Sequence, residues 1–164
     1  MNYHNITKAD MLNGEGVRVV LWVAGCNHHC HKCQNPETWD VNGGIPFDSD
    51  AINEILTELQ KPWCDGLTLS GGDPLHPNNR QTVKELCSIV KANFPNKTIW
   101  CYTGYEWDEI KNLSILRKID VLIDGKFDIM KADINYPWAG STNQRVIDVP
   151  KSLAERSVIL YEST

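Results

Sequence analysis

Residues 17–33 read VRVVLWVAGCNHHCHKC, and the rest of the chain is interpreted outward from this stretch. Residues 17–24 are a mostly apolar run rich in β-branched side chains, which is typical of a strand buried on both faces. Cys26, Cys30 and Cys33 follow at once, with the spacing Cys-x3-Cys-x2-Cys. The sequence therefore predicts a buried strand that leads directly into a loop carrying three thiols.

Downstream of this loop, strand and helix patterns alternate. Apolar runs predict strands at 66–70, 98–102 and 121–123. Apolar residues at helical spacing predict helices around 52–59 and 83–90, with a less regular helix over 107–118. From residue 126 onward the chain reads as mostly irregular, up to an apolar run at 158–160.

The alternation predicts an α/β fold of mostly parallel strands joined by right-handed crossovers. We expect one domain over residues 1–164, built as an incomplete (open) βα barrel, because a full eightfold barrel takes about 250 residues. Ligands in such folds bind beyond the carboxyl ends of the strands. The cysteine loop, residues 71–73 and residues 103–105 each follow a predicted strand, so we expect them to share that edge.

Composition narrows the function classes. The chain has 164 residues, 41% of them apolar, and a net charge of −5 with scattered Lys and Arg, which argues against a nucleic-acid partner. No stretch approaches the roughly 20 apolar residues of a membrane span, and the first residues lack the pattern of a signal peptide. We expect a cytoplasmic protein with no membrane partner. The remaining cysteines, Cys64, Cys87 and Cys101, are dispersed and predicted to be core residues.

The three clustered thiols allow more than one metal chemistry. A closed zinc site or an ordinary ferredoxin cluster uses four protein ligands, and only three cysteines are local here. One hypothesis is a four-iron, four-sulfur cluster with one iron left open to a substrate. A second is a Cys3His zinc site completed by His28, His29 or His31. A third, a thiol–disulfide site on Cys30-x2-Cys33, lacks the helix start expected directly after a strand.

The x3, x2 cysteine spacing after the first strand resembles the radical S-adenosylmethionine superfamily. Within it, the chain resembles the activating components of anaerobic (class III) ribonucleoside-triphosphate reductases over nearly its whole length. Eight segments carry the likeness, in this order: MNYH (1–4), NGEG (13–16), Gly25 to Cys33, NPETW (35–39), LSGGDPL (69–75), TGY (103–105), DGK (124–126) and GSTNQR (140–145).

The resemblance implies a [4Fe–4S] cluster on Cys26, Cys30 and Cys33, and S-adenosylmethionine as the second cofactor. Gly71, Gly72 and Asp73 resemble the superfamily's Gly-Gly-acidic turn, whose backbone and carboxylate receive the methionine ammonium. Lys32, Cys33 and Gln34 correspond to the stretch that lines the adenine side. No side chain is needed as a catalytic acid or base, because the reaction is a hydrogen abstraction.

The implied partners are the large subunit of the anaerobic reductase and a flavodoxin or ferredoxin-type electron donor. An activase of another glycyl-radical enzyme, such as a formate-lyase, and a non-enzymatic zinc-binding module are the alternatives. Three residues depart from the family pattern. Gln34 stands where an aromatic is common, Glu15 where a proline is common, and Ala139 where an arginine is common.

Overall fold

The strand predicted at 17–24 is β2 (Arg18–Val23), and it lies inside a seven-stranded sheet in the computed structural model, which describes residues 1–164. The sheet order is β3-β1-β2-β4-β5-β6-β7. Its four central strands, β2, β4 (Gly66–Gly71), β5 (Thr98–Tyr102) and β6 (Val121–Asp124), are mutually parallel. All four had been predicted, because a strand buried on both faces must be apolar throughout.

The expectation of an open βα barrel is not confirmed: the structure has an open, mixed α/β sheet. Its flanking strands are antiparallel to their neighbours and were not predicted: β1 (Asn2–Asp10), β3 (Ile45–Pro46) and β7 (Arg145–Asp148). They were missed because flanking strands are partly exposed and carry polar side chains, so they show no continuous apolar run.

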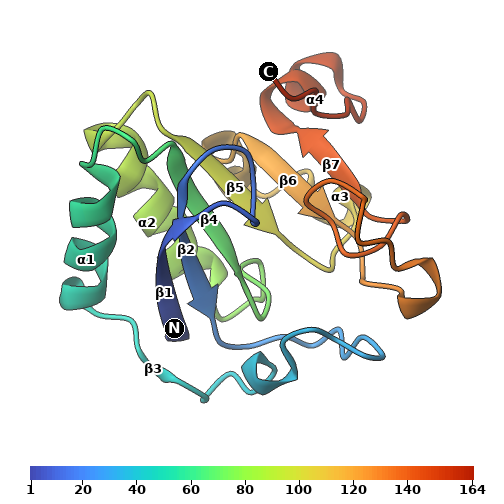
Figure 1. The fold of residues 1–164 in the computed structure, drawn as a ribbon, viewed down its shortest axis with the longest axis horizontal. Helices are drawn as coiled ribbons and strands as arrows, with labels where there is room; N and C mark the ends of the chain where they lie inside the picture. The colour runs from blue at the N-terminus through green and yellow to red at the C-terminus, as the bar shows by residue number, and fades with distance from the viewer.

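Helices α1 (Ser49–Leu59) and α2 (Arg80–Asn93) cover one face of the sheet (Figure 1). Between them and the strands lies a core cluster of 25 buried residues, which includes Cys64, Cys87 and Cys101 as expected. The prediction of a single helix over 107–118 is wrong. The chain forms α3 (Trp107–Ile110) and then a 3-10 helix (Ser114–Lys118), because Leu113 between them is extended.

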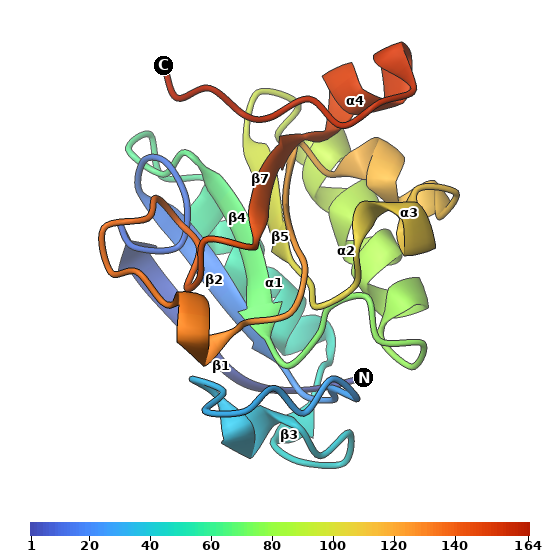
Figure 2. The ribbon, with the colours of Figure 1, turned by 90° about the vertical axis from the view of Figure 1, so that its right-hand side faces the viewer.

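The opposite face of the sheet is covered by the segment that follows β6 (Figure 2). This segment contains a 3-10 helix (Ile129–Lys131) and returns to the sheet as β7, after which α4 (Val149–Glu155) begins. Trp100 is the centre of a small second core there, with the rings of Trp138 and Tyr161 at 5.1 and 5.2 Å. The sheet is therefore buried on both faces.

Arg18 is a buried cation on this second face, with only 1% of its surface exposed and no carboxylate partner. Its guanidinium donates five hydrogen bonds of 2.8–3.0 Å and lies 5.4 Å from the Trp100 ring centre. Burial lowers the pKa of Arg18 to about 10, which still leaves it charged near neutral pH. The acceptors are Thr68 Oγ1, Thr98 Oγ1 and the carbonyls of Glu15, Leu67 and Thr98.

Replacing this cation is expected to be costly. Arg18→Met leaves buried acceptors without donors, so we expect the free energy of unfolding to fall by about 3 kcal/mol or more. Urea denaturation measures this loss. The exposed Arg117→Met is the control, expected to stay within about 0.5 kcal/mol of the parent protein. Equal stability of the two variants would contradict the assignment of Arg18 as a structural donor.

No helix in the structure combines the length and the apolar character needed to cross a lipid bilayer.

Candidate functional site

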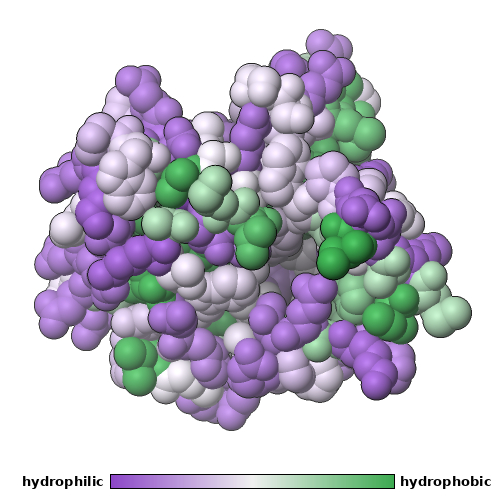
Figure 3. Space-filling view, viewed as in Figure 1, coloured by the Kyte–Doolittle hydropathy of each residue, from purple (hydrophilic) through white to green (hydrophobic).

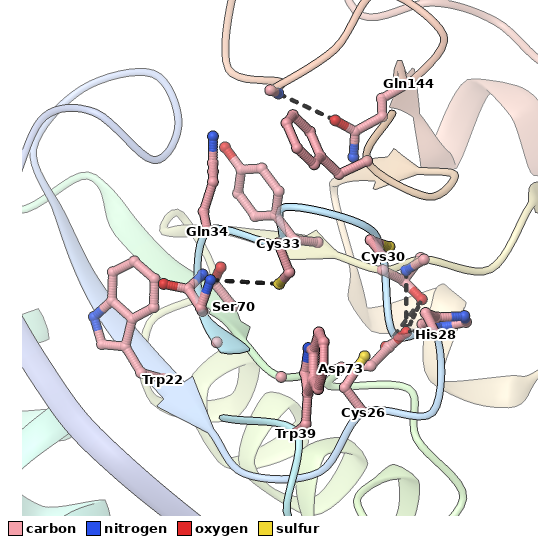
Figure 4. Close-up of a pocket in the computed structure, with 18 of the residues that line it drawn as sticks. Trp22, Cys26, His28, Cys30, Cys33, Gln34, Trp39, Ser70, Asp73 and Gln144 are labelled. Atoms are coloured by element: carbon pink, nitrogen blue, oxygen red, sulfur yellow. Dashed lines mark hydrogen bonds and ion pairs between the residues drawn. The ribbon is translucent and has the colours of Figure 1, made fainter. Parts of the chain in front are cut away.

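The three segments expected to share one edge do meet there. One cavity at the carboxyl ends of β2, β4 and β5 is lined by the cysteine loop and by both turns. None of the 20 residues that line it lies in a helix. Those predicted from sequence are Cys26, Cys30, Cys33, Gln34, Gly71, Gly72, Asp73, Thr103 and Gly104. In Figure 4 the three sulfur atoms face a common space.

Backbone contacts support the thiols. Cys33 Sγ accepts a hydrogen bond from the Asn35 N–H at 3.4 Å. Backbone groups of His28 and Phe127 interact with the Cys26 and Cys30 thiols and favour their charged forms. Hydrogen bonds to cysteine sulfur are one of the means by which a protein sets the reduction potential of an iron–sulfur cluster.

Burial of the thiols opposes the effect of these backbone groups, because it disfavours the charged form. It raises the pKa of Cys26 to about 11 and also raises the pKa of Cys30. Both thiols are therefore protonated near neutral pH when nothing is bound to them. Since thiolates are the metal ligands, binding at these sulfurs must release protons.

None of the three candidate histidines completes a zinc site. His28 Nε2 lies 2.6 Å from Asp73 Oδ2, the His29 ring packs on Trp39 at 4.6 Å, and His31 is exposed. No three His, Cys, Asp or Glu side chains converge so as to hold one metal ion. The donor set fits a polynuclear centre better, because its thiolates attach to different iron atoms.

Asp73 lies in the cavity wall, and its carboxylate accepts hydrogen bonds from four groups of the protein. It is 1% exposed and accepts hydrogen bonds from Thr103 Oγ1, the N–H groups of Leu75 and Gly104, and His28. A carboxylate has about four acceptor positions. A methionine ammonium bound by this carboxylate, the role that the resemblance implies for Asp73, would share its oxygens with these four donors.

The glycines before Asp73 are set by close backbone contact. A Cβ on Gly71, whose φ is +99°, would lie 2.6 Å from the Val23 nitrogen. A Cβ on Gly72 would lie 2.6 Å from the Gly25 oxygen. Only glycine allows the end of β4 to approach the start of the cysteine loop this closely.

The remaining predicted residue, Lys32, does not line the cavity. It is exposed and has a left-handed φ of +58°, within the turn closed by the Cys33 N–H and the Cys30 carbonyl at 3.0 Å. Lys32 thus shapes the turn that places Cys33. Gln34 does line the cavity and lies across from Gly140, whose Cβ would be 3.3 Å from the Gln34 amide nitrogen.

Sequence reasoning missed the residues that reach the cavity from strands, and it quoted Gln144 only as part of the segment 140–145. Trp22 and Ser70 are register partners on β2 and β4, and both line the cavity (Figure 4). Gln144 accepts hydrogen bonds from the Gly140 and Ser141 N–H groups. Trp22 and Ser70 could have been found from sequence, because each lies near the end of a predicted parallel strand, at the edge where ligands bind.

The two other departures from the family pattern have structural roles. Glu15 accepts hydrogen bonds from the Tyr161 hydroxyl and the Thr164 N–H and so fixes the last residues of the chain. Ala139 is 9% exposed and packs into the second core with Trp100.

Three clustered thiols at the carboxyl ends of parallel strands, with no fourth cysteine in the same cavity, are the arrangement expected of a single-cluster iron–sulfur protein. Residues 12–147 match the family described as "4Fe-4S single cluster domain". The anaerobic ribonucleoside-triphosphate reductase-activating protein of phage T4 is 46% identical over 146 residues, which cover 89% of this chain and 93% of the relative. Proteins of the same name in two bacteria are similar to the chain over nearly the same length. The Haemophilus influenzae protein is 44% identical, covering 88% and 96%, and the Escherichia coli K12 protein is 41% identical, covering 89% and 97%. The chain belongs to the family of anaerobic ribonucleoside-triphosphate reductase-activating proteins, as its motifs had predicted.

Proposed function

We propose that this chain is the activase of an anaerobic ribonucleoside-triphosphate reductase and forms a glycyl radical on that enzyme. The observation that carries the proposal is that Cys26, Cys30 and Cys33 line one cavity and that no other cysteine of the chain does. Three thiolates would hold three irons of a [4Fe–4S] cluster and leave one iron open. The names of the relatives support the reductase as the target.

The chemistry supplied by such a cluster is one-electron cleavage of S-adenosylmethionine, which gives methionine and a 5′-deoxyadenosyl radical. Transfer of a hydrogen atom from a reductase glycine to that radical would leave 5′-deoxyadenosine and a glycyl radical. The electron would come from a flavodoxin or ferredoxin-type donor. No acid or base is required of the chain, whose part is to bind, orient and exclude water.

We assign the methionine end of S-adenosylmethionine to the turn at Gly71 and Gly72, where the absence of side chains exposes the backbone. Asp73 contributes by holding that turn in place. The adenine side is assigned to Cys33 and Gln34, with Lys32 acting through the turn. The Gln34 amide offers hydrogen bonds in place of the stacking that an aromatic residue would give.

The target glycine must come within a few ångströms of the radical, so the site has to be open to a protein segment. Figure 3 shows that the face seen in Figure 1 is hollowed. A second groove shares Asn13, Gln34, Tyr102 and Gly140 with the cysteine-lined cavity. Leu12 and Ile134 line this groove and are 82% and 100% exposed, so apolar contacts are available beside the site.

The test uses anaerobically reconstituted protein with S-adenosylmethionine and a one-electron reductant. We expect slow release of 5′-deoxyadenosine alone, and ribonucleotide reduction once the reductase is added. A formate-lyase tested in parallel should stay inactive, and its activation in place of the reductase would show that the client is wrong. A colourless protein with one zinc and no 5′-deoxyadenosine would instead support the zinc-binding module.

A further inference from the structure

The cysteine loop has few connections to the rest of the protein. At its start, the N–H groups of Gly25 and Cys26 donate to the carbonyls of Thr38 and Trp39. Residues 27–33 then make a single backbone hydrogen bond, from Cys33 to Cys30, which is internal to the loop. Cys26 is therefore held by its own N–H, whereas Cys30 has no such backbone hydrogen bond to the rest of the protein. Its position depends on the contact of its thiol with the Phe127 backbone and on side-chain contacts from the residues before it.

His28 supplies such a contact from the middle of the Cys26-x3-Cys30 span. Its side chain is 9% exposed, and its Nε2 lies 2.6 Å from Asp73 Oδ2. The ring packs edge-on against Tyr105, with centroids 4.6 Å apart. Gly104 makes room for it, since a Cβ there would lie 2.4 Å from the His28 ring. Figure 4 shows His28 directed away from the space between the sulfurs and toward Asp73.

The Asp73 carboxylate, which accepts the hydrogen bond from His28, is oriented by donors that lie outside the cysteine loop. Thr103 Oγ1 lies 2.9 Å from both Asp73 oxygens, and the Gly104 N–H donates to Oδ2 at 3.0 Å. The Leu75 N–H donates to Oδ1 at 2.8 Å. These donors belong to the turns after β4 and β5, so the carboxylate is oriented by the sheet and offers the loop a preformed anchor.

We propose that His28 is the positioning residue of the cysteine loop: its bond to Asp73 ties the Cys26-x3-Cys30 span to the ends of β4 and β5. The loop is thereby placed before any cluster forms. The anchor itself is a property of the cluster-free protein, and only its consequence for iron retention rests on the proposed function.

Two variants separate the hydrogen bond from the packing of the ring. His28→Phe keeps a ring against Tyr105 but has no donor, whereas His28→Gln keeps a donor near the position of Nε2. In cluster-free protein, trypsin cleavage after the exposed Lys32 reports opening of the loop. Cleavage after the exposed Arg117, which lies in the 3-10 helix Ser114–Lys118 and does not line the cavity, is measured in the same digest, so the ratio of the two rates cancels global unfolding.

We expect His28→Phe to raise that ratio about tenfold or more, the factor for one lost hydrogen bond to a charged group, and His28→Gln to recover much of the difference. In reconstituted protein without S-adenosylmethionine, a chelator should remove iron from His28→Phe faster by a similar factor. The exposed His31→Phe should leave iron retention unchanged.

An unchanged cleavage ratio in His28→Phe would overturn the proposal, whatever the iron does. So would a His28→Gln protein that behaves like His28→Phe, because the donor would then be irrelevant. If the protein held no iron at all, the proposed function would fail while the cleavage ratio still decided the anchor.

Discussion

Changing any one of Cys26, Cys30 or Cys33 to alanine is expected to lower the iron content of anaerobically reconstituted protein from about four per chain to near zero. Two thiolates cannot hold a cluster in which one iron already lacks a protein ligand. The three sulfurs line one cavity, and no other cysteine reaches it. Iron and sulfide analysis of the purified variants measures the effect.

The matched controls are the other three cysteines, each 0–1% exposed in the main core. Cys64→Ala and Cys101→Ala should keep the cluster. Cys87→Ala should also keep it and lower the free energy of unfolding by about 1 kcal/mol through a small cavity. Normal iron in any of the three loop variants would mean that the ligands are wrongly assigned.

The second large effect is expected from Asp73→Asn. Sequence reasoning alone predicts weaker S-adenosylmethionine binding and an intact cluster. In the structure, the asparagine amide would place a donor against the donors of His28, Thr103 and Gly104. Because unpaired buried groups cost about 1–3 kcal/mol each, we expect a loss of about 3 kcal/mol in unfolding free energy, together with faster loss of iron.

Urea denaturation and chelator challenge measure the two losses, with the exposed Asp133→Asn as the control. A variant that kept parental stability and iron but bound S-adenosylmethionine more weakly would contradict this view. That result would instead favour a direct contact between the Asp73 carboxylate and the methionine ammonium.

The centre of the fold could be predicted from sequence because burial on both faces forces a continuous apolar run, as in β2 and β4. The same reasoning fails at the flanks. β1 reads NYHNITKAD and β7 reads RVID, so polar residues interrupt any apolar run. Both strands are partly exposed and join the sheet through backbone hydrogen bonds. Backbone pairing leaves little trace in the side-chain pattern, so these strands appear only in the folded chain.

The candidate site likewise has a part that the sequence predicts and a part that only the structure shows. That Cys26, Gly72 and Thr103 would share one edge follows from strand direction, a local property. The partners of Asp73 depend on which atoms the turn after β5 brings within 3 Å, and the sequence records no such distance. For the same reason the sequence allows His28 as a zinc ligand, whereas in the structure its ring is directed toward Asp73 and away from the three sulfurs.

The most direct measurement of the central claim is the electron paramagnetic resonance spectrum of the reductase after anaerobic incubation with this protein, S-adenosylmethionine and a one-electron reductant. We predict a glycyl doublet that requires all four components and collapses to a singlet when the reductase glycines carry deuterium at Cα. The absence of that doublet, with an intact and reducible cluster on Cys26, Cys30 and Cys33, would contradict it.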